Sequence, residues 1–261
     1  MNVYKRLFSY EIKNIFRDNM TATMVVYPLV MTLFGAYLIP LIIDQFDVGP
    51  GVFTASIIIL IVLASLAPML AGSMLGFLLL DHKDENTLDS LRVTPVSLTH
   101  YLTFKSIYTY GLSVLSSLVI LYGVKYLSGD GYTYLGSNVW QSITPLSIVT
   151  FSVVSALFAP VFGLLIATLG NNKIEGFAYL KSLGILILVP ALVTLDVLQD
   201  IRQYALGIVP TFWPVKGLLE SASLTDNAAN LSSAWYSVIG TVYLIGLCVL
   251  FIRLFIRRIA H

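Results

Sequence analysis

Charged residues are scarce in this chain. Asp, Glu, Lys and Arg make up 11% of its 261 residues, whereas hydrophobic residues make up 57%. A soluble domain carries about 25% charged residues, so the composition excludes an ordinary soluble globular protein. The formal net charge is only +1, and the basic stripe that nucleic-acid binding requires is missing. We therefore expect an integral membrane protein in contact with the lipid bilayer, with no nucleic-acid partner.

Several motifs of catalytic and metal chemistry are also missing. Cys248 is the only cysteine, so the chain has no CxxC pair and no intrachain disulfide. His82, His100 and His261 are far apart in sequence, and the acids around Asp84 lack the spacing of a calcium loop, so we expect no metal site. There is no GxxxxGK[ST] loop to bind nucleotide phosphates. The chain is expected to hold no cofactor and to have no energy source of its own.

Six long apolar runs are the main feature that is present. A membrane-spanning helix needs about 20 mostly apolar residues. Runs of that order lie at residues 21–43, 52–80, 101–127, 143–169, 178–195 and 234–256. We interpret them as six transmembrane helices of a single transmembrane domain, residues 1–261. The expected fold class is an all-α polytopic membrane protein.

Proline and glycine mark special positions inside these runs. Pro68 and Pro190 lie in the second and fifth runs, where each removes one backbone hydrogen bond and produces a kink that neighbouring helices can accommodate. Gly72 and Gly76 form a GxxxG pattern in the second run. Such a pattern permits two helices to approach closely without specifying a dimer.

Positive charges divide unevenly between the loops. If the N-terminus is cytoplasmic, the outer loops hold only Lys125, Arg202 and Lys216, and the other twelve of the 15 Lys and Arg residues are on the cytoplasmic side. Cytoplasmic loops of membrane proteins carry an excess of Lys and Arg. We therefore expect a multi-pass protein of the cell (inner or plasma) membrane with both termini in the cytoplasm, where the segment 80–105 also lies.

Three segments outside the runs have features of their own. Residues 3–17 place apolar side chains on one helical face and cationic ones on the other, which predicts an N-terminal elbow helix in the membrane interface. Residues 84–95 predict a short amphipathic helix in which Leu88 and Leu91 are one turn apart. Residues 196–233 contain apolar pieces too short to span a membrane, which we interpret as re-entrant or interfacial helices on the outer side.

Ionisable side chains are missing from the middle of every predicted span. Membrane enzymes and ion-coupled transporters normally place ionisable groups at that depth. This disfavours an integral membrane enzyme and a secondary transporter, which stay as alternatives together with a scaffold that carries a cytoplasmic docking loop. The apolar spans favour an amphipathic or lipid-like cargo over a multiply charged one.

The sequence DENTLDSLRVTPVS at residues 84–97 resembles a motif of ABC-2 type transporter permeases. The family pattern is an acidic residue, Gly-Thr-Leu, a leucine pair and Thr-Pro-hydrophobic-Ser. Asn86 stands here in place of the glycine, and Asn tolerates the left-handed backbone that glycine would supply. The matching residues are Glu85, Thr87, Leu88, Leu91, Thr94, Pro95, Val96 and Ser97. The stretches NNKIEGFAYLK and PTFWP resemble a subgroup labelled fluoroquinolone or drug export permeases.

This resemblance implies a function, partners and site residues. In the family, two permease chains work with two ATPase chains, and the loop helix is a coupling helix seated in a cleft of the ATPase. Substrate would pass between the permeases along spans two and five, where Pro68 and Pro190 permit bending. The coupling residues would be Glu85, Thr87, Leu88, Leu91, Arg92, Thr94 and Pro95.

The expected function is therefore that of the permease subunit of an ATP-driven exporter. The cargo would be an amphipathic or lipophilic small molecule, such as a drug, a peptide or a lipid. The chain itself would not be an enzyme, because ATP and Mg would bind to the separate ATPase subunit. A second permease chain, identical to this one or not, would complete the transporter.

Overall fold

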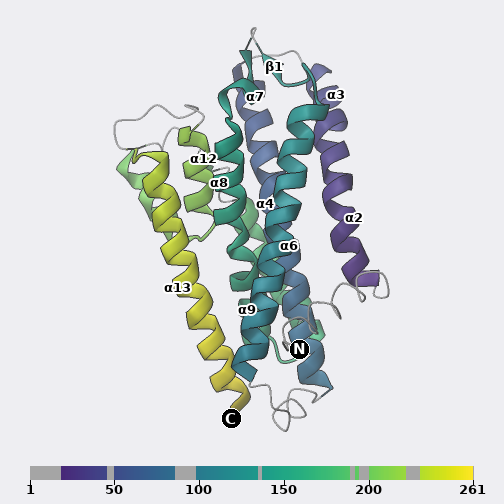
Figure 1. The fold of residues 1–261 in the computed structure, drawn as a ribbon, viewed down its shortest axis with the longest axis vertical. Coiled ribbons are helices and arrows are strands. Elements are labelled where there is room, and N and C mark those ends of the chain that lie inside the picture. Colours follow the sequence, from purple (N-terminus) through teal and green to yellow (C-terminus); the bar gives the residue numbers. More distant parts are fainter. Residues whose placement is uncertain are drawn as a thin grey trace, which may run out of the picture.

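The computed structural model describes residues 19–45, 50–85, 98–134, 137–188, 192–193, 200–221 and 230–260. Nearly all of them are helical, and the longest helices lie side by side along the long axis of the molecule (Figure 1). This confirms the expected all-α class. The predicted elbow helix at residues 3–17 lies outside the described residues.

The first apolar run forms a rod of three helical pieces. Helix α2 spans Asn19–Leu33, the π-helical segment η1 spans Phe34–Leu38, and α3 spans Ile39–Asp44. Pro40 has no N–H to donate to the carbonyl four residues earlier, which accounts for the wider π-helical backbone directly before α3. The rod agrees with the predicted run at 21–43, although its apolar part, Val26–Ile42, is shorter than that of the other long helices.

Four helical stretches within the described residues are long and apolar enough to cross a membrane. They correspond to the second, third, fourth and sixth predicted runs. They are Ile58–Asp84 in α4 (Pro50–Asp84), Leu98–Leu127 (α6), Pro145–Leu169 (α8, Pro145–Ala156, and α9, Phe158–Leu169), and Ser233–Ile259 in α13 (Ser233–Ala260).

The fourth run is interrupted at a single residue. Leu157 separates α8 from α9, and its N–H bonds to the carbonyls of Val154 and Ser155 instead of continuing the regular ladder. Pro160 follows three residues later and cannot donate to the carbonyl of Ala156. Leu157 keeps a right-handed helical backbone, so the two halves continue in one direction as a single membrane-spanning unit.

The structure does not confirm the fifth predicted span, residues 178–195. Helix α10 spans Lys173–Leu183 and is followed by a tight 3-10 segment, η2, at Gly184–Leu188. The α-helical part is 11 residues long, too short to cross a membrane. The change of backbone occurs at Gly184, where the helix loses the support of a side chain. Within the described residues, four helices of membrane-spanning length are therefore present, and the predicted number of six is not confirmed.

The long connection between the fifth and sixth runs contains two short helices in its described part. The 3-10 helix η4 spans Ile201–Ile208 and α12 spans Phe212–Ser221. Neither is long enough to span a membrane, as expected. Helix α12 packs against α8 and α13, so it belongs to the bundle instead of lying apart from it.

A small hairpin closes one end of the bundle, which we call the hairpin end (Figure 1). Strands β1 (Thr133–Tyr134) and β2 (Ser137–Asn138) pair in antiparallel fashion and lead into the short helix α7 (Val139–Ser142). The Tyr132 hydroxyl donates to the carbonyl of Gly35 over 2.5 Å, and its ring meets Trp140 edge to face at 6.0 Å. These contacts fix the hairpin on the π-helical segment of the first rod.

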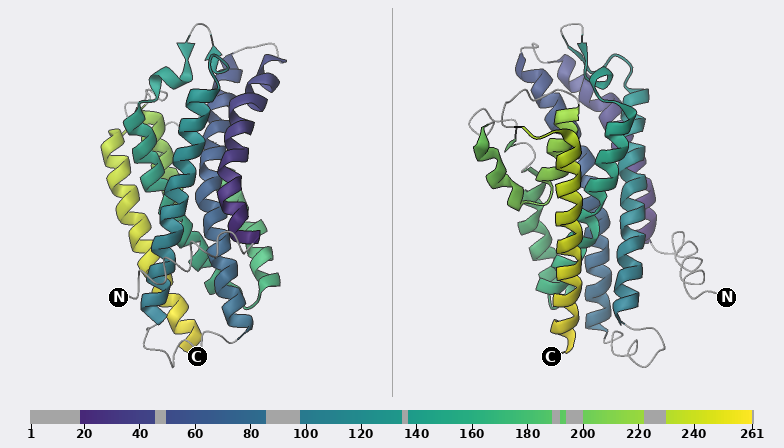
Figure 2. Two further views of the ribbon diagram at one scale, coloured as in Figure 1. Left: turned by 45° about the vertical axis from the view of Figure 1, so that its right-hand side comes forward. Right: turned by 60° about the vertical axis from the view of Figure 1, so that its left-hand side comes forward.

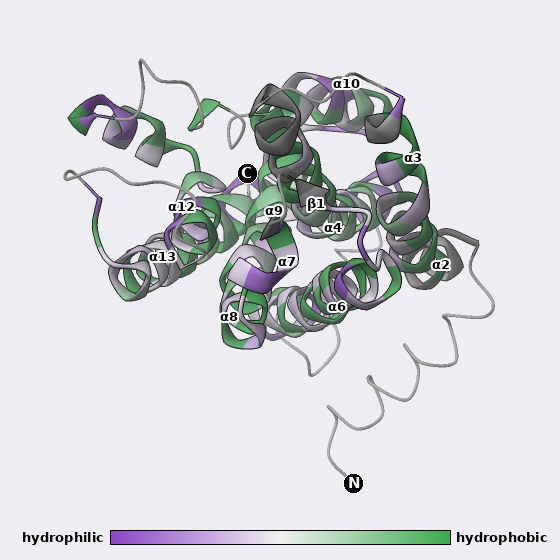
Figure 3. Cartoon of the chain, turned by 90° about the horizontal axis from the view of Figure 1, so that it is seen from above, coloured by the Kyte–Doolittle hydropathy of each residue, from purple (hydrophilic) through white to green (hydrophobic). Residues whose placement is uncertain are grey.

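Helices α4 and α8–α9 form the centre of the bundle. In their most apolar stretches 61% and 72% of the residues are buried, against 33% in α6 and 17% in α13. The views in Figures 2 and 3 agree that α13 and α2 lie at opposite sides of the molecule, with α12 beside α13. The peripheral helices therefore present most of the surface that faces lipid.

The closest helix contact joins α4 to α9. A Cβ atom added to Gly72 would collide with the carbonyl oxygen of Ala159, and one added to Gly76 would lie 3.0 Å from the carbonyl oxygen of Gly163. A Cβ on Gly163 would in turn collide with the carbonyl of Gly72. The GxxxG pattern of the sequence is thus used for packing within this chain.

Candidate functional site

At the end of the bundle opposite the hairpin, α4, α9 and α13 end and α6 begins (Figure 1). Charged side chains gather there, among them Asp81, Lys83, Lys173 and Arg258. We call this end the charged end. Residues 86–97 connect α4 to α6 here and lie outside the described residues, as do the predicted coupling residues Thr87, Leu88, Leu91, Arg92, Thr94 and Pro95. Glu85 is described: it is exposed in the turn that ends α4, and its N–H donates to the carbonyl of Asp81 over 2.9 Å.

Two cations from distant parts of the chain cap the C-terminus of α9. The Lys83 ammonium donates to the carbonyls of Ala167 at 2.8 Å and Gly170 at 2.9 Å. The Arg258 guanidinium donates to the carbonyl of Thr168. The last carbonyls of a helix have no intrahelical partner and carry partial negative charge, so both cations are well placed. This double cap holds α4, α9 and α13 together.

The connection from α9 to α10 is tied to the last turn of α4. Lys173 forms an ion pair with Asp81, and its backbone N–H donates to Asp84 Oδ2 over 3.3 Å. The hydrogen bond to Asp81 raises the pKa of Lys173 above its usual value. Asn172 caps α10 by accepting the N–H of Glu175 at 2.9 Å. The turn directly before residues 86–97 is therefore fixed from the side of α10.

The first turns of α6 are fixed to the same turn of α4. The hydroxyl of Tyr101 lies 3.2 Å from His82 Nδ1. The ammonium of Lys105 lies 5.9 Å from the centre of the Tyr101 ring, and that of Lys83 lies 5.3 Å from the centre of the Phe255 ring, both within the range of cation–π attraction. Both stems of the 86–97 segment are thus anchored on the bundle.

The two predicted bending positions have different outcomes. Pro68 is buried in α4, one turn before Gly72, the residue at which α4 and α9 come closest. Pro190 lies outside the described residues. The structure does not bring the two prolines together, and their role in bending stays a prediction.

A cavity of about 420 Å³ lies between α8, α12 and α13, in the half of the bundle nearer the hairpin. The side chains of Phe151, Val154 and Leu218 form part of its apolar lining. Sequence reasoning did not find it, because its walls come from three helices whose pairing the sequence does not specify. Its hydroxyl-bearing residues are Ser147, Thr150, Ser221, Ser233 and Ser237.

The environment of Lys216 differs most from what the sequence analysis predicted. Lys216 was assigned to an outer loop, but its side chain in α12 is fully buried and its Nζ has no hydrogen-bond partner within the part of the chain that the structure describes. Glu220, one turn further along α12, accepts a hydrogen bond from Asn230 Nδ2 at 2.8 Å, and Asn230 Oδ1 accepts one from Gln203 at 3.1 Å. The signal in the sequence was the apolar residues on all sides of Lys216, which are typical of a helix buried all round.

Apolar helices of membrane-spanning length, with charges gathered at one end, define a polytopic helical membrane protein. The family model described as "Fluoroquinolones export permease protein Rv2686c-like" matches residues 11–252, and the chain belongs to this family. It is therefore a transporter component, as the resemblance to export permeases implied.

Two relatives from Mycobacterium tuberculosis support the same assignment. They are the fluoroquinolones export permease proteins Rv2686c, from strain ATCC 25618 / H37Rv, and MT2760, from strain CDC 1551 / Oshkosh. Each is 29% identical over 213 residues, which cover 79% of this chain and 77% of the relative. The similarity thus extends over most of both chains, and both relatives are named as permeases, not as enzymes.

Proposed function

We propose that this protein is the permease subunit of an ABC-2 type exporter in which a separate ATPase subunit hydrolyses ATP. The observation that carries the proposal is the anchoring of both stems of the 86–97 segment at the charged end. When both ends of a loop are fixed in this way, a force on the middle of the loop is transmitted to the helices at its ends. The DENTLDSLRVTPVS motif of this loop is the part that would meet the ATPase.

The contacts at the charged end would transmit a displacement of the 86–97 loop to several helices. The last turn of α4 carries Asp81, bound to α10, and Lys83, bound to the end of α9. Arg258 links the same end of α9 to α13. Displacement of the loop would move these helices together and bias the permease between inward-open and outward-open states, provided that the ATPase contacts differ in the two states.

This assignment also implies an orientation in the membrane, a set of partner chains and a class of cargo. The charged end faces the cytoplasm of a cell membrane, in agreement with the excess of Lys and Arg on that side. Two permease chains and two ATPase chains form the transporter, with Mg and ATP bound on the ATPase. The cargo is an amphipathic or lipophilic small molecule that is exported. The names of the two relatives, which refer to fluoroquinolones, support a drug-like cargo.

The coupling role is tested by Leu88→Asp, expressed with the candidate ATPase. We expect the variant to reach the membrane but to lose co-purification with the ATPase, because a charge replaces an apolar contact. Ile174→Asp is the matched control, since Ile174 is 82% exposed on α10 and lies outside the loop. Co-purification and substrate-stimulated ATP hydrolysis that both survive Leu88→Asp would contradict the proposal.

The alternatives give different results in vesicles. An ABC exporter accumulates cargo only when ATP is supplied and only when the ATPase is present. Transport that continues without ATP and responds to an ion gradient would support a secondary transporter. Chemical conversion of the cargo would support a membrane enzyme.

A further inference from the structure

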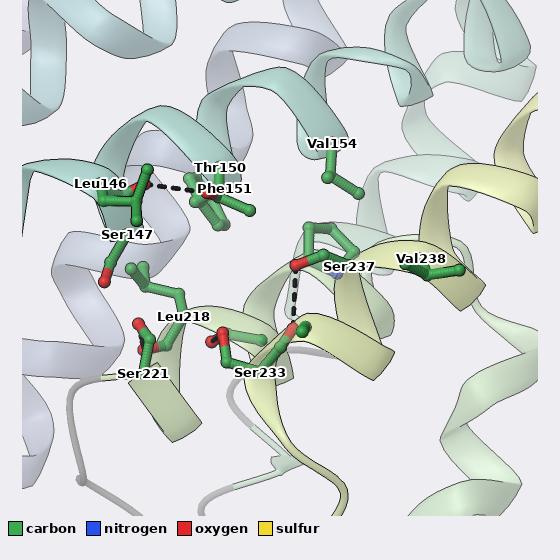
Figure 4. Close-up of a pocket in the computed structure, with 13 residues that line it drawn as sticks. Leu146, Ser147, Thr150, Phe151, Val154, Leu218, Ser221, Ser233, Ser237 and Val238 are labelled. Carbon is green, nitrogen blue, oxygen red and sulfur yellow. Dashed lines mark hydrogen bonds between the residues drawn. The ribbon is translucent and has the colours of Figure 1, made fainter.

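The cavity between α8, α12 and α13 has the size of a small-molecule site. Its volume of about 420 Å³ falls within the roughly 300–1,000 Å³ of typical ligand pockets. Figure 4 shows side chains from all three helices around it. Apolar residues form much of its wall, and five hydroxyl groups are distributed among them.

At least four of the five hydroxyl hydrogens in this cavity are already engaged within the chain. A Ser or Thr hydroxyl has one hydrogen to donate and two lone pairs to accept with. Four of the five donate to backbone carbonyls, and two of these bonds are drawn in Figure 4; the fifth, Ser147, shares a hydrogen bond with Thr144. The four are Thr150 to Leu146 (2.9 Å), Ser221 to Leu218 (2.8 Å), Ser233 to Gly217 (2.9 Å) and Ser237 to Ser233 (2.9 Å). These hydroxyls therefore offer a ligand mainly acceptor lone pairs.

Among the described residues, those that line the cavity include no charged side chain. A carboxylate ligand would be removed from water without a cation to pair with, and such a transfer is costly. An ammonium ligand would lack a carboxylate to pair with. The helix ends at the cavity favour neither sign of charge, because Ser147 and Ser233 lie in the first turns of α8 and α13, whereas Ser221 is the last residue of α12. The electrostatics favour an uncharged ligand.

Apolar side chains that border the cavity are exposed on the outer surface of the bundle. Leu146 is 75% exposed and Val238 is 53% exposed, and both line the cavity. They lie on α8 and α13, two of the helices of membrane-spanning length. A molecule dissolved in the bilayer would thus reach the cavity from the side.

We propose that this cavity binds an uncharged, lipid-soluble molecule through a group that donates hydrogen bonds, such as an alcohol or an amide. Building on the proposed function, this molecule belongs to the lipophilic part of the cargo class proposed above. The apolar wall holds the body of the molecule, and the hydroxyl oxygens of Ser233 and Ser237 accept from its polar group.

The experiment uses the purified permease alone in lipid nanodiscs and three photoreactive probes with the same diazirine-bearing dodecyl tail. The probes end in a hydroxyl, a carboxylate and a trimethylammonium group. We expect the alcohol to label peptides of α8 and α13 at the cavity about ten-fold more efficiently than the charged probes. Equal labelling by all three, or stronger labelling by a charged probe, would overturn the proposal.

Two variants sharpen this test. Ser237→Ala removes one acceptor and should weaken competition by unlabelled dodecanol about two- to ten-fold, the range that one hydrogen bond contributes. Thr241→Ala is the matched control, because Thr241 makes the same kind of bond on α13, to the carbonyl of Ser237 at 2.7 Å, and does not line the cavity. Loss of labelling in both variants would show a general effect on α13 and contradict the specific site.

The same measurement separates this proposal from the proposed function. Labelling requires no ATPase, so it should persist in Leu88→Asp even though coupling is lost. Labelling at the cavity in a protein that never co-purifies with an ATPase would leave the site standing and refute the exporter assignment. Normal ATPase coupling without selective labelling would support the exporter assignment and refute the binding site.

Discussion

The two halves of the bundle are held together by different means. Toward the charged end, α4 and α9 touch backbone to backbone at Gly72 and Gly163, and the helix ends are capped by Lys83 and Arg258. Toward the hairpin end, a cavity lies between α8, α12 and α13, and Lys216 is buried with no hydrogen-bond partner among the described residues. In the first half, two helices meet at their backbones and two cations cap a helix end, whereas the second half keeps an open cavity and a buried lysine.

The two halves are therefore suited to different roles: the charged half to transmitting movement, and the hairpin half to changing its shape. Close packing and the two capping cations make the charged half move as one body, because separating its helices would break many contacts at once. Empty volume and unsatisfied polar groups lower the local free energy cost of rearrangement in the hairpin half. The molecule thus combines a stiff part next to the segment 86–97 with a more adaptable part around the cavity.

The largest effect is expected where the stiff half is tightest. Gly72→Ala should destabilise the protein by about 3 kcal/mol, because its Cβ meets the carbonyl of Ala159 and backbone cannot yield as a side chain does. Gly111→Ala on α6 is the control, since a Cβ there meets nothing within 4 Å and should stabilise the helix by about 0.5–1 kcal/mol. Thermal unfolding in nanodiscs measures both, and effects of the same sign would contradict the close packing.

Removal of one cap tests whether charge or packing holds the charged end. Lys83→Met keeps most of the side-chain volume but loses both hydrogen bonds to the end of α9, and should cost about 2 kcal/mol, as for hydrogen bonds to a charged group. Arg253→Met, an exposed cation on α13, should change the unfolding temperature little. Equal effects would mean that the caps add nothing specific.

The hairpin half should respond in the opposite direction to loss of a charge. Lys216→Met removes a buried ammonium for which the described residues provide no hydrogen-bond partner, so we expect a gain in stability of about 1 kcal/mol. The measurement is again thermal unfolding, at neutral pH. A clear loss of stability would show that Lys216 makes a favourable interaction and would remove one of the contrasts between the halves.

The smallest effect is expected for the exposed ion pair between Lys173 and Asp81. Lys173→Gln should leave the unfolding temperature unchanged within error, because solvent screens such pairs. The pKa of Lys173 is raised in the folded state, so its contribution is present below the unfolded pKa of about 10.4 and disappears as the pH rises above it. Any difference in unfolding temperature between wild type and variant should therefore be within error and should not change from pH 6 to pH 9.

The sequence predicted those features that depend on local composition. Four apolar runs became helices of spanning length, and the run at 101–127 agrees with α6, Leu98–Leu127, to within three residues at its start. An apolar run records how much chain can enter lipid, but it does not record whether the backbone stays α-helical. The run at 178–195 therefore looked like the others, although the helix gives way at Gly184.

Features that depend on pairing between distant segments could not be predicted. The GxxxG pattern marked a face of α4 for close approach, but not α9 as its partner. Lys83 and Arg258 were counted only as cytoplasmic charges, and their meeting on one helix end follows from the tertiary fold. The cavity and the burial of Lys216 have the same origin. The coupling residues in 86–97 stay predictions from sequence.

The position of α13 in the chain has a consequence for biogenesis. Helix α13 follows every other described helix in the sequence, and membrane helices emerge from the ribosome in sequence order. It supplies Arg258 to the end of α9 and one wall, including Ser233 and Ser237, to the cavity. Both regions are therefore completed by the same late insertion event, so a nascent chain that stalls before α13 lacks the finished cap and the finished cavity together.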